Sequence, residues 1–68
     1  MKSYYVTFKY QDGNKELDSE EIDFEDNEEV SQRTVYDKVQ ALHDDWYTYR
    51  EVGKIIAWSR IEENNNIN

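Results

Sequence analysis

The first regular pattern in the chain is an alternation of apolar or aromatic residues with other residues between positions 4 and 10. The residues on one side of this alternation are Tyr4, Val6, Phe8 and Tyr10. A period of two is typical of a strand that buries one of its faces. The dipeptide Asp12-Gly13 follows, and it favours a type I′ turn. The sequence therefore predicts a β-hairpin near the start of the chain.

In the second strand of this hairpin, a single register cannot place all the apolar residues on one face. A two-residue loop pairs Phe8 with Leu17 across the hairpin. If that register continued, Ile22 and Phe24 would point to solvent, because side chains alternate between the two faces of a strand. We therefore predict a β-bulge near residues 18–20, which brings both residues onto the face of Leu17 and leaves the carboxylates in solvent.

A helical period follows the second strand. Asp26 and Asn27 offer N-cap oxygens, and Glu29 stands three residues after Asp26, which is the spacing of a capping box. Arg50 and Gly53 are typical of a helix C-terminus. The expected apolar stripe covers about five turns and consists of Ser31, Val35, Val39, Leu42, Trp46 and Tyr49.

The last apolar run, residues 54–62, predicts a third strand that lies antiparallel beside the first. The expected fold class is α+β, a small ββαβ domain. Its three-stranded antiparallel sheet has the order 2-1-3 and is packed on one face by a single helix. We assign residues 1–63 to this single domain and residues 64–68 to a frayed, Asn-rich tail.

Charge and length narrow the classes of function. The chain has 68 residues, no cysteine, and 16 acidic against 8 basic residues, which gives a formal net charge of −8. This charge repels phosphate backbones and anionic lipids, so neither direct nucleic-acid binding nor a membrane partner is expected. The sequence contains no apolar stretch of the roughly 20 residues that span a bilayer. We expect a cytoplasmic protein without a cofactor or a metal site.

The candidate chemistry for catalysis is sparse. Without cysteine, a nucleophilic mechanism would depend on a serine and the single histidine, His43, and no serine stands at a suggestive spacing from it. His43 is followed by Asp44 and Asp45, which is typical of a surface histidine. The sequence therefore predicts a protein that is not an enzyme.

The most distinctive feature of the chain is an acidic run between Lys15 and Arg33 that no basic residue interrupts. It consists of Glu16, Asp18, Glu20, Glu21, Asp23, Glu25, Asp26, Glu28 and Glu29. Solubility and the helix dipole explain three or four such charges. A run of nine favours a binding module that docks on a basic protein surface.

The sharpest form of this hypothesis is a nucleic-acid mimic that inhibits a nucleic-acid-binding protein. In composition alone the chain is similar to small acidic inhibitors encoded by phages and mobile elements. An antitoxin or immunity partner of a basic toxin is a further form. The opposing interpretation is that the acids only keep the domain in solution.

The tyrosines give the alternative function, an interaction or assembly protein that works through aromatic contacts. Tyr5, Tyr36 and Tyr47 are the candidate contact residues, since Tyr is frequent at binding hot spots. In the competing interpretation, which we favour, Tyr36, Tyr47 and Tyr49 extend the packing stripe of the helix at the rim of the core, with their hydroxyls in water. A sheet with one helix also leaves a face uncovered, so a homodimer is a further expectation.

Overall fold

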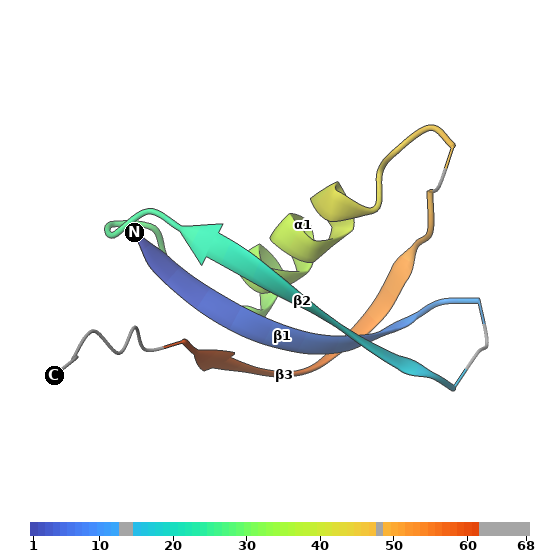
Figure 1. Ribbon diagram of the computed structural model, residues 1–68, viewed down its shortest axis with the longest axis horizontal. Coiled ribbons are helices and arrows are strands. Elements are labelled where there is room, and N and C mark those ends of the chain that lie inside the picture. The colour runs from blue at the N-terminus through green and yellow to red at the C-terminus, as the bar shows by residue number, and fades with distance from the viewer. Residues whose placement is uncertain (13–14, 48, 62–68) are drawn as a thin grey trace, which may run out of the picture.

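The computed structural model describes residues 1–12, 15–47 and 49–61. Its elements are β1 (Lys2–Tyr10), β2 (Leu17–Phe24), α1 (Gln32–Leu42) and β3 (Val52–Arg60). The three strands form an antiparallel sheet in the order β2-β1-β3, and α1 covers one face of it (Figure 1). The predicted fold class and strand order are confirmed. The expected tail, residues 64–68, and the predicted domain boundary lie outside the described residues.

The core lies between α1 and one face of the sheet. Its buried side chains come from all four elements and are Val6, Phe8, Ile22, Phe24, Val35, Val39, Val52 and Ile55. Aromatic side chains such as Tyr4 pack around them, and the ring of Tyr4 meets that of Phe24 edge to face at 5.6 Å. Large aromatic side chains let a chain of this length bury enough apolar area to fold.

The register of β1 and β2 differs by one residue from the prediction. Phe8 lies opposite Asp18, not Leu17, and the pairing continues without a shift along β2. Ile22 and Phe24 therefore reach the core with no bulge, while Leu17 is on the opposite face and 53% exposed. The predicted bulge is wrong because the connection is longer than the expected two-residue loop. The turn residues 13–14 lie outside the described residues.

The sheet does contain bulges, but they are in β3. Between the pairs Thr7–Ala57 and Phe8–Ile55 one extra residue, Ile56, is left over. A second shift leaves Gly53 as the extra residue.

Gly53 stands where the backbones approach closely. A Cβ atom at this position would lie 3.1 Å from both the carbonyl carbon and the carbonyl oxygen of Tyr10. Glycine thus permits the close approach at the bulge. The expectation that Gly53 ends the helix is wrong, because the residue belongs to β3.

The helix is shorter than predicted at both ends. Its N-cap is Ser31, whose hydroxyl accepts from the backbone N–H of Thr34, while the Thr34 hydroxyl accepts from the N–H of Ser31. This reciprocal pair provides acceptors for two backbone N–H groups at the start of the helix, so the predicted N-cap at Asp26 is not used. At the other end, Gln40 receives a hydrogen bond from the Val52 N–H and donates one to the Arg50 carbonyl. These bonds direct the chain away from the helix axis and towards β3.

The predicted apolar stripe therefore ends after Val39. Leu42 is 53% exposed, and beyond the helix Trp46 is 84% and Tyr49 56% exposed. The acidic side chains of Asp44 and Asp45 follow the last turn, where the helix dipole disfavours negative charge. Within the described residues, no helix is both long and apolar enough to cross a membrane.

Candidate functional site

The acidic run follows the uncovered edge of the sheet. β2 pairs with β1 on one side only, and the chain continues from its end into the loop that leads to α1 (Figure 1). We call the carboxylates of β2 and this loop the acidic edge: Asp18, Glu20, Glu21, Asp23, Glu25, Asp26, Glu28 and Glu29. Glu16, the remaining member of the run, lies exposed just before β2. Sequence reasoning placed these acids on one outer face, whereas the structure divides them among three surroundings.

Asp18 and Glu20 point to the face of the sheet that α1 covers. They lie opposite Phe8 and Val6, whose side chains are in the core. The hydroxyl of Tyr10 donates to Asp18 Oδ2 at 2.7 Å. These two carboxylates therefore lie at the helix side of the sheet, where Asp18 remains exposed and Glu20 is partly exposed.

His43 completes this group and is not the surface histidine that the sequence indicated. Its ring packs edge to face against Phe8 and Tyr10, and its side chain is 13% exposed. Nδ1 donates to the carbonyl of Val39 at 2.9 Å, and Nε2 lies 3.1 Å from the Tyr10 hydroxyl and 3.9 Å from Glu20 Oε2. The histidine thus joins the end of α1 to the sheet.

The hydrogen bonds and charges of this group determine the protonation states of Tyr10 and Asp18. Partial burial, followed by the hydrogen bond to Asp18 and its negative charge, raises the pKa of Tyr10 to about 12. The same hydrogen bond, with one from the backbone N–H of Ser19, lowers the pKa of Asp18. Near neutral pH Tyr10 is a hydrogen-bond donor and Asp18 a carboxylate acceptor, which are positioning roles.

Glu21 and Asp23 point to the opposite, open face of the sheet. Asp23 accepts a hydrogen bond of 2.6 Å from the hydroxyl of Ser3, its neighbour on β1. Glu21 lies opposite Tyr5, whose side chain is 50% exposed. The candidate aromatic contact Tyr5 and two of the candidate carboxylates therefore share one surface.

The loop after β2 carries the other four acids, and two of them form ion pairs. Asp26 contacts the N-terminal ammonium group at 2.8 Å, and this hydrogen bond and charge lower the pKa of Asp26. Glu28 accepts from the backbone N–H of Glu25 and pairs with Lys38 at 3.3 Å, which lowers the pKa of Glu28. Within the parts of the chain that the structure describes, the carboxylates of Glu21, Glu25 and Glu29 have no such partner.

The three candidate tyrosines lie in three different places. Tyr36 packs against the core, and its hydroxyl donates to the Val52 carbonyl at 2.8 Å, so it joins α1 to β3. The position of Tyr36 agrees with the core-rim interpretation, but its hydroxyl bonds the backbone of β3 instead of reaching water. Tyr47 is 87% exposed in the connection between α1 and β3, far from a core-rim position, and its neighbour Trp46 is 84% exposed.

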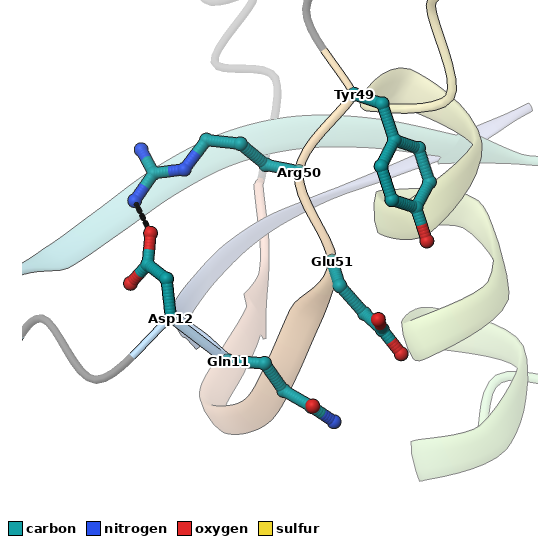
Figure 2. Close-up of a pocket in the computed structure, with 5 residues that line it drawn as sticks. All are labelled: Gln11, Asp12, Tyr49, Arg50 and Glu51. Carbon is teal, nitrogen blue, oxygen red and sulfur yellow. Dashed lines mark hydrogen bonds and ion pairs between the residues drawn. The ribbon is translucent and has the colours of Figure 1, made fainter.

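Sequence reasoning missed a pocket at the end of the molecule where β1 leaves the sheet. Gln11, Asp12, Tyr49, Arg50 and Glu51 line it, and its volume is about 420 Å³ (Figure 2). The guanidinium of Arg50 lies 3.5 Å from the centre of the Tyr10 ring and donates to Asp12. The signal in the sequence was the aromatic and acidic segment 44–51, which was assigned instead to the end of a long helix.

Comparison with known proteins adds no relative: the chain matches no protein-family model, no curated protein and no solved structure. Across residues 1–12, 15–47 and 49–61, no group of three or more His, Asp or Glu side chains is arranged to hold a metal ion. The acidic edge and the exposed aromatic residues are therefore the features that bear on function.

Proposed function

We propose that this protein is a non-enzymatic binding module that docks its acidic edge on a basic protein surface. The observation that carries the proposal is the position of the acidic run on an uncovered edge strand and the adjoining loop. Asp18 and Glu20 leave this strand on one side, and Glu21 and Asp23 leave it on the other. A partner that approaches the edge meets negative charge from both faces of the sheet.

The spacing of these charges supports the nucleic-acid mimic as the sharpest form of the proposal. A strand rises about 3.3 Å per residue, so the four carboxylates from Asp18 to Asp23 span about 17 Å and follow one another at a mean interval of about 5.5 Å. A single DNA strand carries one phosphate per about 3.4 Å of axis. Both are rows of negative charge a few ångströms apart, so the preferred partner is a nucleic-acid-binding protein with a basic groove.

Internal contacts explain part of the acidic edge but not all of it. Asp18, Asp23, Asp26 and Glu28 each stabilise the fold through a hydrogen bond or an ion pair. Glu21 has no such role among the described residues. Unpaired like charges reduce stability through mutual repulsion, so a binding function accounts for them better than the fold does.

The test compares charge reversal on the acidic edge with the same change elsewhere. Glu21→Lys and Glu25→Lys alter the edge, and Asp37→Lys makes the matched change on the exposed side of α1. The tagged wild-type chain is first used to capture a partner from lysate of its source organism at low salt. Association rates of the purified partner with all variants are then measured between about 50 and 300 mM salt.

We expect the two edge variants to associate several-fold more slowly and with a weaker salt dependence, because charge at an interface mainly acts on the association rate. Asp37→Lys should change the rate much less. Competition by DNA would support the mimic form. If the edge variants associate like the wild type, the acids serve solubility alone and the proposal is wrong.

The alternative is an interaction protein that works through aromatic contacts, and one observation favours it. Among the described residues, Trp46 and Tyr47 are the most exposed of the large hydrophobic side chains. Under this alternative, Tyr47→Ala abolishes partner binding while salt has little effect on it. The salt series above separates the two functions.

A further inference from the structure

The pocket at the end of the sheet has two sides of different chemistry. It lies where the chain leaving β1 meets the chain entering β3, and the N–H of Gln11 donates to the carbonyl of Glu51 at 2.8 Å. Figure 2 shows Arg50 and Asp12 turned toward each other on one side of this connection and Tyr49 on the other. A volume of about 420 Å³ is at the lower end of the range for small-ligand sites, so the pocket suits a single long side chain.

The charges that line this pocket do not cancel. Arg50 is already paired with Asp12 and lies over the ring of Tyr10, so this guanidinium and this carboxylate neutralise each other. Glu51 is left with no ion-pair partner among the described residues. The pocket therefore has one uncompensated negative charge.

Tyr49 forms an aromatic wall beside that charge. Its side chain is 56% exposed. Partial desolvation, and then the negative charges of Glu51 and Asp44, raise the pKa of Tyr49, which agrees with a negative potential around its ring. A cation that enters the pocket thus meets a carboxylate and the face of an aromatic ring, and both attract it.

Trp46 and Tyr47 lie in the same connection between α1 and β3 as Tyr49. Their rings lie 6.2 Å apart at 80° and are almost fully exposed. The backbone N–H of Tyr47 donates to Asp45 Oδ1 at 2.8 Å, which holds this turn in place. Exposed aromatic side chains of this size mark contact surfaces and are frequent among binding hot spots.

The charges around these aromatic residues select the kind of partner. Asp45 accepts from the Tyr47 backbone, and the charges of Glu51 and Asp44 act on Tyr49, so phosphate groups of nucleic acids or anionic lipids are repelled. A second copy of the chain would bring the same three acids and is repelled too. A basic protein is the partner whose charge complements this surface.

We propose that the pocket receives an arginine side chain of the basic partner, with Glu51 as its counter-charge and Tyr49 as its stacking surface. Trp46 and Tyr47 then cover the apolar residues beside that arginine. Arginine is favoured over lysine because its planar group stacks on an aromatic ring and also bonds a carboxylate. This inference rests on the proposed function, since it names a second point at which the same partner is bound.

The experiment uses a decamer of arginine as the probe, with a decamer of lysine for comparison. Isothermal titration calorimetry at low salt gives the affinities of the full chain, and amide chemical shifts show where the peptide binds. Glu51→Gln and Tyr49→Ala alter the pocket, and Asp37→Asn removes one charge from the exposed side of α1. Glu21→Gln makes the same change on the acidic edge.

We expect the arginine peptide to bind more tightly than the lysine peptide and to shift the amides of residues 11–12 and 49–51. Glu51→Gln and Tyr49→Ala should each raise the Kd for the arginine peptide about three- to fivefold. This is the size of effect expected when one partly exposed charge pair or cation–π contact is lost. Asp37→Asn should raise it by less than about 1.5-fold.

Two results would overturn the inference, and they differ in what they say about the proposed function. If Glu21→Gln weakens binding while Glu51→Gln and Tyr49→Ala do not, the acidic edge binds the peptide and the pocket does not. If Glu51→Gln, Glu21→Gln and Asp37→Asn all have equal effects, the peptide responds to net charge alone, and neither surface is a specific site.

Discussion

Replacing Tyr10 by phenylalanine tests the link between the acidic edge and the core. The hydroxyl that is removed donates to Asp18 at 2.7 Å and faces Nε2 of His43 at 3.1 Å. The ring keeps its edge-to-face contacts with Phe8 and His43 and its contact with Arg50. The substitution therefore removes polar contacts without creating a cavity.

The expected loss in the free energy of unfolding depends on the strength of the Tyr10–Asp18 hydrogen bond and on how far solvent reaches it. A hydrogen bond to a charged group contributes about 1.5–3 kcal/mol when well protected. Tyr10 and Asp18 lie at the margin of the sheet and are partly solvated, so we expect about 1 kcal/mol near pH 7. The shift of the Tyr10 pKa from 10 to about 12 corresponds to at most about 2.7 kcal/mol before this reduction.

The free energy of unfolding that Tyr10→Phe removes should become smaller both in acid and in alkali. The pKa of Asp18 is lowered in the folded state, so its stabilisation is complete above about pH 4 and disappears as the pH falls through the folded value. The pKa of Tyr10 is raised, so its stabilisation is complete below pH 10 and disappears as the pH rises toward about 12. The difference in the free energy of unfolding between wild type and Tyr10→Phe should thus be constant between about pH 4 and pH 10 and become smaller at lower and at higher pH.

Urea unfolding of both proteins from pH 2 to pH 11.5 measures this difference. Tyr5→Phe is the control, because Tyr5 is half exposed on the open face and its hydroxyl bonds no group among the described residues. It should leave the free energy of unfolding almost unchanged. A Tyr10→Phe loss that is constant across the pH range would show that the hydroxyl does not bond the Asp18 carboxylate.

Three further substitutions test the fold by the free energy of unfolding in urea. Phe24→Ala should cost about 3–5 kcal/mol because the side chain is fully buried, whereas Leu17→Ala should cost less than about 0.5 kcal/mol; equal losses would contradict the register of β2. Gly53→Ala should cost about 1 kcal/mol, since its Cβ would press on the Tyr10 carbonyl, and a stabilised variant would refute the close approach at the bulge. Ser31→Ala should cost about 1 kcal/mol through loss of the N-cap, and an unchanged stability would place the helix start elsewhere.

The order of elements could be predicted from the sequence because it depends on local patterns. The period of two in β1 and the stripe through Val35 and Val39 each mark one element without reference to the rest of the chain. The strand order then followed from placing the third strand antiparallel beside the first. These features need only the alternation of side chains and the burial of one face.

The boundaries could not be predicted, because distant contacts decide them. The helix stops at Leu42 because Gln40 bonds the backbone at Arg50 and Val52, residues that no periodicity connects to it. The N-cap is Ser31, which the sequence pattern had placed in the apolar stripe, although Asp26 and Glu29 have the spacing of a capping box. The bulges of β3 depend on the fit of that strand to β1, which only the assembled sheet defines.

The candidate site was foreseen in its composition but not in its arrangement. The acidic run was evident, yet the one-residue difference in register moved Asp18 and Glu20 to the helix side of the sheet. Trp46 and Tyr49 were assigned to a buried stripe, and the structure exposes both. The apolar period continues past the end of the helix, so it predicted a helix that is too long. Asp44 and Asp45, directly after His43, were the local evidence that the helix ends there.

The two edges of the sheet are protected from pairing with other chains by different means. On β2 the protection is charge, whereas on β3 it is the irregular backbone at Gly53 and Ile56. Charge is neutralised by acid and screened by salt, but a bulge is unaffected by either. We therefore expect strand-to-strand aggregation to begin at β2, and only in acid or at high salt, so storage at neutral pH and low ionic strength should prevent it.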